Sequence, residues 1–276
     1  MQSLSDDIIS YIFKYINIDD ISTISLVCKQ FYNNFESNIL WDYYLRRDID
    51  NDVLNILFSK EYDNIKNYSL GNKYKSVYKF VYKIKTIKMF CYRNDLKTLL
   101  SSKSIYASEV YILSFIPIEL CYISILTNLY LSSNNLTIIP PEFGNLINLK
   151  YLYIRNNKLT TLPPEFGKLI NLKILNIAIN NFKSIPFTIC ELINLEELSM
   201  SNNKLESIPT TIDNLTNLKK LNLSTNKLKS IPSNICELIN LEELNLFDNE
   251  VINIPSEIGK LSSLYELNKI EIKIIK

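Results

Sequence analysis

The chain has 276 residues, of which 47% are hydrophobic, and its formal net charge is +1. The near-neutral charge excludes a global attraction to nucleic acid or to an acidic membrane. Histidine is absent and only four glycines occur, which excludes histidine-dependent nucleophilic catalysis and a glycine-rich phosphate loop. We therefore expect a protein that is not an enzyme, with no catalytic residues, no metal and no cofactor.

The five cysteines show no paired spacing, so we expect buried free thiols rather than disulfides or a zinc site. They are Cys28, Cys91, Cys121, Cys190 and Cys236. Asp6 and Asp7 stand where a signal peptide is most apolar, and no uncharged run reaches the roughly 18 residues of a membrane span. We expect a soluble intracellular protein in the cytoplasm, with the nucleus as an alternative, and no membrane partner.

The first segment, SLSDDIISYIFKYI (3–16), predicts a helix that Ser5 can cap. A second helix is predicted over 21–35, and ESNILWDYYL (36–45) ends the unit with the single tryptophan. Three helices in about 45 residues cannot form an independent core of ordinary size. We expect another molecule to cover their surplus apolar surface, although a bundle that merely caps the rest of the chain is an alternative.

These residues resemble the F-box family, whose members dock on the adaptor subunit of cullin–RING ubiquitin ligases. The resemblance implies a set of adaptor-binding residues, with Asp20 also at the family's spacing: Leu4, Ile8, Ile9, Ile12, Phe13, Ile16, Ile21, Val27, Cys28, Phe31, Leu40 and Trp41. The chain departs from the family at Ser5, where a proline usually follows the first leucine.

Residues 48–102 are predicted to form a helical linker. The segment YKSVYKFVYKIKTIKMF (74–90) predicts a helix with one apolar face, after a loop at Gly71. Residues 64–93 contain eight lysines and arginines and no acidic residue, which is the best indication of nucleic-acid binding in the chain. We expect instead a solvated lysine face and no nucleic-acid partner.

From Leu126 onward the chain repeats every 23 residues, in six regular repeats over 126–263. Each repeat has an LxxLxL segment, which predicts a short strand with its leucines inward, then a fixed asparagine and a fixed proline. The asparagines are Asn134, Asn157, Asn180, Asn203, Asn226 and Asn249, and the prolines are Pro140, Pro163, Pro186, Pro209, Pro232 and Pro255. Asparagine can bond the backbone of adjacent coils, and proline interrupts the return segment.

Residues 103–125 are predicted as a degenerate first repeat, in which Lys103 and Ser108 are polar inward positions of a cap. Residues 264–276 are predicted as a C-terminal cap with a short edge strand, in which Lys269 takes the place of a leucine.

This region resembles the leucine-rich-repeat family, which implies a solenoid with a curved parallel sheet on its concave face. The fold class expected for the whole chain is α+β and multi-domain. A small α-helical F-box bundle (1–47) and the helical linker (48–102) precede an α/β leucine-rich-repeat solenoid (103–276).

The outward strand positions form columns on the concave face, one of which contains Ala178. We predict the following substrate-binding residues there, because tyrosine and arginine are enriched at binding hot spots: Tyr130, Tyr151, Tyr153, Arg155, Ile174, Glu197, Lys220, Glu243 and Phe247. The alternative is that they are solvated strand residues. The Glu–Glu pairs at 196–197 and 242–243 are interpreted as a solvated edge.

Together these features predict a substrate-recognition adaptor of a cullin–RING (SCF-type) ubiquitin ligase, whose partners are the adaptor subunit and an unidentified protein substrate. The alternative is a leucine-rich-repeat scaffold that regulates a GTPase or phosphatase. Richness in Asn, Ile, Lys and Tyr suggests an AT-rich genome. The combination is similar to proteins of giant DNA viruses or slime moulds, where it would act in a host cell.

Overall fold

The computed structural model describes residues 51–57, 96–108 and 113–268. The predicted F-box residues, the basic helix over 74–90 and Lys269 lie outside these ranges. The chain divides into two compact units, Met1–Ser101 and Ser102–Lys276, which are described separately.

The first unit contains two described helices, α5 (Asn51–Leu57) and α7 (Leu96–Ser101), within the segment predicted as a linker. Val53 on α5 and Leu100 on α7 are buried, and Lys97 Nζ lies 2.6 Å from Asp52 Oδ2. No helix within the described ranges has both the length and the apolar character needed to cross a membrane.

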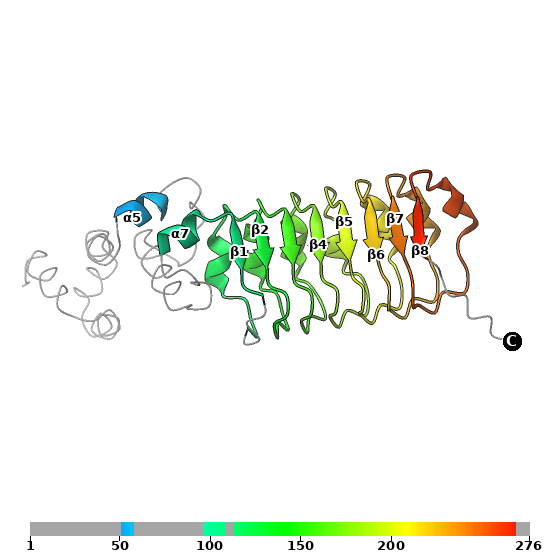
Figure 1. Ribbon diagram of the computed structural model, residues 1–276, viewed down its shortest axis with the longest axis horizontal. Coiled ribbons are helices and arrows are strands. Elements are labelled where there is room, and N and C mark those ends of the chain that lie inside the picture. The colour runs from blue at the N-terminus through cyan, green and yellow to red at the C-terminus, as the bar shows by residue number, and fades with distance from the viewer. Residues whose placement is uncertain (1–50, 58–95, 109–112, 269–276) are drawn as a thin grey trace, which may run out of the picture. The chain divides into compact units, whose positions relative to one another are not determined.

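The second unit is built on a parallel sheet of eight strands, which follow one another in chain order (Figure 1). The strands are β1 (Ser104–Tyr106), β2 (Asn128–Tyr130), β3 (Tyr151–Tyr153), β4 (Ile174–Asn176), β5 (Glu197–Ser199), β6 (Lys220–Asn222), β7 (Glu243–Asn245) and β8 (Glu266–Asn268). From β2 to β8 each strand pairs with the next at the same repeat position, 23 residues further along. This arrangement is consistent with a leucine-rich-repeat solenoid.

The return segment of each coil contains a short 3-10 helix. These helices are η3 (Ile118–Tyr122), η4 (Pro141–Asn145), η5 (Pro164–Lys168), η6 (Phe187–Ile189), η7 (Thr210–Asn214), η8 (Ser233–Glu237) and η9 (Ser256–Lys260). The recurring proline immediately precedes each helix from η4 to η9, with φ between −71° and −54°. Each of these helices spans only three to five residues, a single tight turn such as the 3-10 geometry commonly forms.

The core of the second unit consists of the repeated leucines, which the alternating pattern predicted to point inward. Leu129, Leu152 and Leu175 at the strand centres are fully buried, and Phe143 stacks on Phe166 at a centroid distance of 5.9 Å. Cys121, Cys190 and Cys236 are buried free thiols, as predicted. Cys28 and Cys91 lie outside the described residues.

The recurring asparagine bonds each coil to the preceding one. Asn157 Nδ2 donates to the carbonyls of Leu131 and Ile154 at 3.0 and 3.2 Å, and its Oδ1 accepts from the Leu136 N–H at 3.0 Å. Asn180 and the later ladder asparagines repeat the arrangement. The ladder therefore satisfies buried backbone groups where the chain leaves each strand.

The residue before each ladder asparagine has a left-handed backbone. The φ values lie between 52° and 56° at Ser133, Asn156, Ile179, Asn202, Thr225 and Asp248. Asparagine tolerates this conformation, whereas the β-branched Ile179 and Thr225 are strained in it.

In the first coil the strand register differs by one residue from the predicted 23-residue period. Ile105 pairs with Leu129, a spacing of 24, although η3 and η4 are still 23 residues apart. The buried positions are therefore Ile105 and Ala107, and the prediction that Lys103 and Ser108 point inward is wrong, since both are exposed. The extra residue falls between Ala107 and η3, where it shifts the strand but not the return segment.

Candidate binding face

The first and third residues of strands β2 to β7 are half-buried and outward, while the second is buried. We call the outward side chains of β1 to β7, together with the residue two positions after each strand, the strand face. All nine predicted substrate-binding residues lie on it. Tyr151 and Tyr153 are the first and third residues of β3, and Arg155 lies two positions after β3. The other six residues occupy equivalent positions on β2 and on β4 to β7.

Three tyrosines form a parallel stack at the β1 end of the strand face. The ring centroids of Tyr106 and Tyr130 lie 4.6 Å apart, and those of Tyr130 and Tyr153 lie 5.0 Å apart, with interplanar angles of 6° and 4°. Burial raises the pKa of the Tyr153 hydroxyl, with further contributions from Tyr130 and Glu197. The Tyr153 hydroxyl consequently remains a protonated hydrogen-bond donor at neutral pH.

The sequence interpretation missed Tyr106, which is 68% exposed at the end of this stack. A uniform 23-residue period aligns Tyr106 with the buried Leu129, whereas the observed register aligns it with Tyr130. The aromatic surface is therefore larger by one ring than the repeat alone indicated. Tyr151 lies on the same strand as Tyr153, one outward position earlier.

A shallow hollow of about 250 Å³ lies over β3 to β7. It brings together five of the predicted residues: Tyr153, Ile174, Glu197, Lys220 and Glu243. Asn176, Ser199, Asn222 and Asn245, which were not predicted as site residues, complete its polar lining. Tyr130, Tyr151, Arg155 and Phe247 do not line the hollow, although Arg155 and Phe247 are exposed nearby on the strand face.

Two charged residues of the hollow are paired with each other. Lys220 Nζ lies 2.7 Å from Glu243 Oε1, which also accepts a hydrogen bond from the Tyr265 hydroxyl at 3.0 Å. The bond to Lys220 lowers the pKa of Glu243, and the same bond raises the pKa of Lys220. Both groups are therefore charged at neutral pH.

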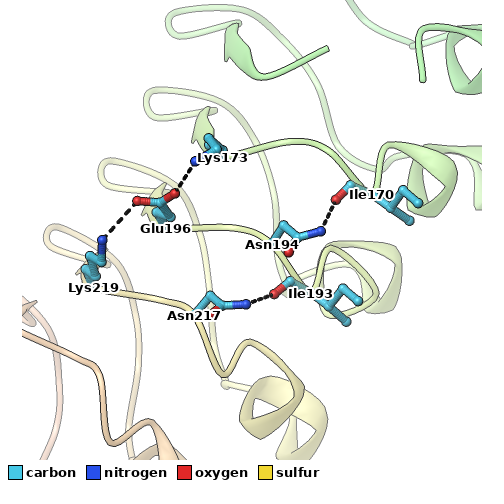
Figure 2. A network of polar contacts seen from close by, with 7 residues as sticks. All are labelled: Ile170, Lys173, Ile193, Asn194, Glu196, Asn217 and Lys219. Carbon is cyan, nitrogen blue, oxygen red and sulfur yellow. Dashed lines mark hydrogen bonds and ion pairs between the residues drawn. The ribbon is translucent and has the colours of Figure 1, made fainter. Parts of the chain in front are cut away.

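A second charged cluster lies just before the strands. Glu196 bridges Lys173 Nζ at 2.7 Å and Lys219 Nζ at 3.1 Å (Figure 2). Glu196 was interpreted as a solvated edge residue, but it joins three successive coils, and these bonds lower its pKa.

Figure 2 also shows part of a second asparagine ladder, on the outside of the coils. Asn194 Nδ2 donates to the Ile170 carbonyl, and Asn217 Nδ2 to the Ile193 carbonyl, each at 2.8 Å. Asn148, Asn171 and Asn240 make the equivalent bonds. The 23-residue recurrence of these asparagines is visible in the sequence, but no bonding role was predicted for them.

One residue of the predicted outward columns does not contribute to the surface. Ala178 is 2% exposed, because its small side chain is covered by its neighbours. Within the described ranges, no three cysteine or carboxylate side chains gather where they could hold a metal ion. The strand face offers hydrogen-bonding, charged and aromatic groups, which are the means of binding another molecule.

Family comparisons match both parts of the chain. The description "F-box domain" matches residues 1–43, "Leucine-rich repeat region" matches 133–218 and "Leucine rich repeat" matches 193–251. No curated protein matches the chain.

Solved structures resemble the repeat region. The chain is 34% identical to the leucine-rich-repeat ectodomain of the plant membrane receptor kinase GASSHO1/SCHENGEN3 from Arabidopsis thaliana, solved in complex with CASPARIAN STRIP INTEGRITY FACTOR 2, with a TM-score of 0.51. It is 32% identical to the plant peptide hormone receptor RGFR1 in complex with RGF2, with a TM-score of 0.50. It is 33% identical to the Leptospira interrogans protein LIC12759, with a TM-score of 0.43.

These matches cover 55% to 56% of this chain. The chain in turn spans 51% of the Leptospira protein, 19% of the GASSHO1/SCHENGEN3 structure and 26% of RGFR1. The F-box match over 1–43 and the repeat matches over 133–251 support the interpretation of the chain as an F-box and leucine-rich-repeat protein.

Proposed function

We propose that this protein is a substrate-recognition adaptor of a cullin–RING (SCF-type) ubiquitin ligase. The observation that carries the proposal is the presence, in one chain, of an F-box match over residues 1–43 and a repeat unit with a polar and aromatic strand face. In this proposal residues 1–47 dock on the adaptor subunit, residues 48–102 connect, and residues 103–276 bind a protein substrate.

On the adaptor side, the proposal assigns contact to the F-box residues from Leu4 to Trp41 that the sequence predicted. Their apolar character supports it, since a segment of this length buries too little of its own surface to be stable alone.

On the substrate side, the proposal assigns binding to the strand face. Tyr130 and Tyr153 are held in a stack, so little side-chain entropy is lost when they contact a partner. Two similar repeat structures are described as complexes with a bound partner, which supports a binding role for this type of surface.

The activity proposed needs no bond-making chemistry in this chain. An adaptor accelerates modification by holding the substrate near the ligase, so its contribution is proximity and orientation. F-box and leucine-rich-repeat domains are typically interaction modules without catalysis.

The docking half of the proposal is tested by combining Ile9→Asp with Phe13→Asp. We expect the double variant to lose the cullin adaptor subunit in pull-downs, because two charges on the segment predicted to dock oppose its burial. Ile138→Asp is the matched control: Ile138 is 61% exposed and off the strand face, so this variant should retain the adaptor. Recovery of the adaptor by the double variant would show that the docking surface is wrongly assigned.

The substrate half is tested by Tyr151→Ala combined with Tyr153→Ala, and by proximity labelling of cells with and without residues 1–47. We expect the tyrosine variant to keep the adaptor and to lose labelled substrate proteins. Phe187→Ala, an exposed aromatic outside the strand face, is the control. If the wild-type chain recovers no adaptor yet still labels partners on the strand face, the scaffold alternative is favoured instead.

A further inference from the structure

The hollow on the strand face is lined by three asparagine side chains whose amide oxygens already accept hydrogen bonds. Oδ1 of Asn176, Asn222 and Asn245 accepts a hydrogen bond from the backbone N–H two residues further on, at 3.2, 3.0 and 3.0 Å. These bonds fix the orientation of each amide. The Nδ2 groups donate to no acceptor among the described residues, so the lining presents donors in excess of acceptors.

Glu197 lies in the same hollow, where Lys220 is near enough to interact with its charge but is not bonded to it. Glu197 makes no ion pair and no side-chain hydrogen bond within the described ranges, although Lys220 is its neighbour in the strand register. Lys220 instead pairs with Glu243, which the Tyr265 hydroxyl helps to hold in place. The three charged residues of the lining therefore leave a net charge of −1, centred on Glu197.

We propose that the hollow binds an extended peptide segment of the substrate that carries one lysine or arginine. The cation pairs with the Glu197 carboxylate, and backbone carbonyls of the segment accept hydrogen bonds from Nδ2 of Asn176, Asn222 and Asn245. This inference rests on the proposed function, because it names the class of substrate for the same strand face.

The spacing of the donors suits a peptide. Adjacent parallel strands lie about 4.8 Å apart, so Asn176 and Asn222, two strands apart, are separated by about 10 Å, or about three residues of extended chain. A metal ion fits less well, since amide N–H groups cannot coordinate a cation and only one carboxylate is free. An anion would meet the negative charge of Glu197. A basic peptide uses both kinds of group at once.

The two kinds of contact have separate roles. Amide donors to backbone carbonyls are independent of the peptide's sequence, whereas the Glu197 carboxylate selects the basic side chain. A charge-assisted pair in a half-buried hollow contributes about tenfold in affinity.

The test is selection from a randomised decapeptide phage library on the immobilised full-length chain. We expect enrichment of lysine or arginine at one position of the selected peptides. Glu197→Gln should weaken binding of a selected peptide about tenfold, and Ser199→Arg should block it by placing a cation inside the hollow. Glu206→Gln, the same chemical change at an exposed residue that does not line the hollow, should bind as the wild type does.

Selected peptides without a basic preference, or peptides that Glu197→Gln binds equally well, would overturn this inference. If Ser199→Arg still blocked those peptides, the strand face would remain the binding surface and the proposed function would stand. Absence of any selected peptide, or binding that Ser199→Arg leaves unchanged, would overturn both the inference and the assignment of substrate binding to this face. The adaptor pull-down tests separately whether the F-box segment binds the adaptor subunit.

Discussion

The backbone carbonyl oxygen of Glu165 lies so close to Gly144 that a Cβ added at Gly144 would be 2.5 Å from it. Gly144 is in η4 and Glu165 in η5 of the next coil, so this contact measures how closely successive return segments approach. A backbone atom cannot move aside as a side chain can, and the adjacent coils must separate if the glycine is replaced.

Gly144→Ala should therefore destabilise the repeat unit by about 1–3 kcal/mol, the usual cost of overpacking. Gly259 occupies the same repeat position in η9, where an added Cβ meets nothing within 4 Å. Gly259→Ala should leave the stability within about 0.5 kcal/mol of wild type or raise it slightly. Calorimetric unfolding of the two variants compares them directly, and equal transition temperatures would contradict the close approach.

Ile179→Asn should stabilise the protein although it removes a hydrophobic side chain. Ile179 has φ 52°, a conformation that is strained by about 1–2 kcal/mol for an ordinary L-residue, and asparagine occupies the equivalent position at Asn156 and Asn202. Because Ile179 is only half-buried, we expect a net gain of about 0.5–1 kcal/mol in the free energy of unfolding.

Ile170→Asn is the control for that variant, since Ile170 is exposed and its φ is not positive. It should change the unfolding free energy by less than about 0.5 kcal/mol. Urea titrations of both variants provide the measurement. A loss of stability in Ile179→Asn would mean that its side-chain contacts outweigh the backbone strain.

Asn180→Ala should be strongly destabilising, by about 2–3 kcal/mol, because it leaves buried backbone groups of two coils unpaired. Asn180 Nδ2 donates to the carbonyls of Ile154 and Ile177 at 3.0 and 3.1 Å, and its Oδ1 accepts from the Leu159 N–H at 3.0 Å. Amide hydrogen exchange should show the loss first at Leu159, whose N–H loses its acceptor.

Asn194→Ala gives the comparison from the second asparagine ladder, on the outside of the coils. There the side chain makes one exposed hydrogen bond, to the Ile170 carbonyl. Water can replace that bond, so the expected cost is about 0.5–1 kcal/mol. Similar losses of stability in the two alanine variants would show that the stabilising effect of Asn180 does not depend on its burial.

Glu196→Gln should lower the transition temperature at neutral pH by about 1–2 °C, because it removes an ion pair to each of two neighbouring coils. The folded-state pKa of Glu196 lies below its ordinary value, owing to the bonds from Lys173 and Lys219. Its contribution to stability is therefore fully present above the unfolded-state pKa and is lost as pH falls through the folded-state pKa.

The difference between wild type and Glu196→Gln should accordingly be present at pH 7, shrink below about pH 4.5, and also shrink in 1 M salt. Calorimetry of both proteins across pH and salt provides the check. A difference that stays constant down to pH 2 would show that the carboxylate acts through its shape and not its charge.

Much of the repeat unit could be predicted from the sequence because its rules are local. The alternation within LxxLxL placed Leu152 and its equivalents inside, and the 23-residue period placed Tyr151 and Tyr153 on the strand face. The first coil was mispredicted because a single extra residue shifts the strand register without disturbing the return segment. Because of that shift, a uniform 23-residue period did not place Tyr106 on the strand face.

The sequence alone determined the period, the buried leucines and the outward columns, since these depend on the two-residue alternation of a strand and on the constant length of a coil. The tertiary structure alone decided which outward groups act together. It bonds Lys220 to Glu243 and not to Glu197, and it places three tyrosine rings in one stack. These outcomes depend on distances between side chains of different coils, which are set by how the coils stack and not by the order of residues within any one of them.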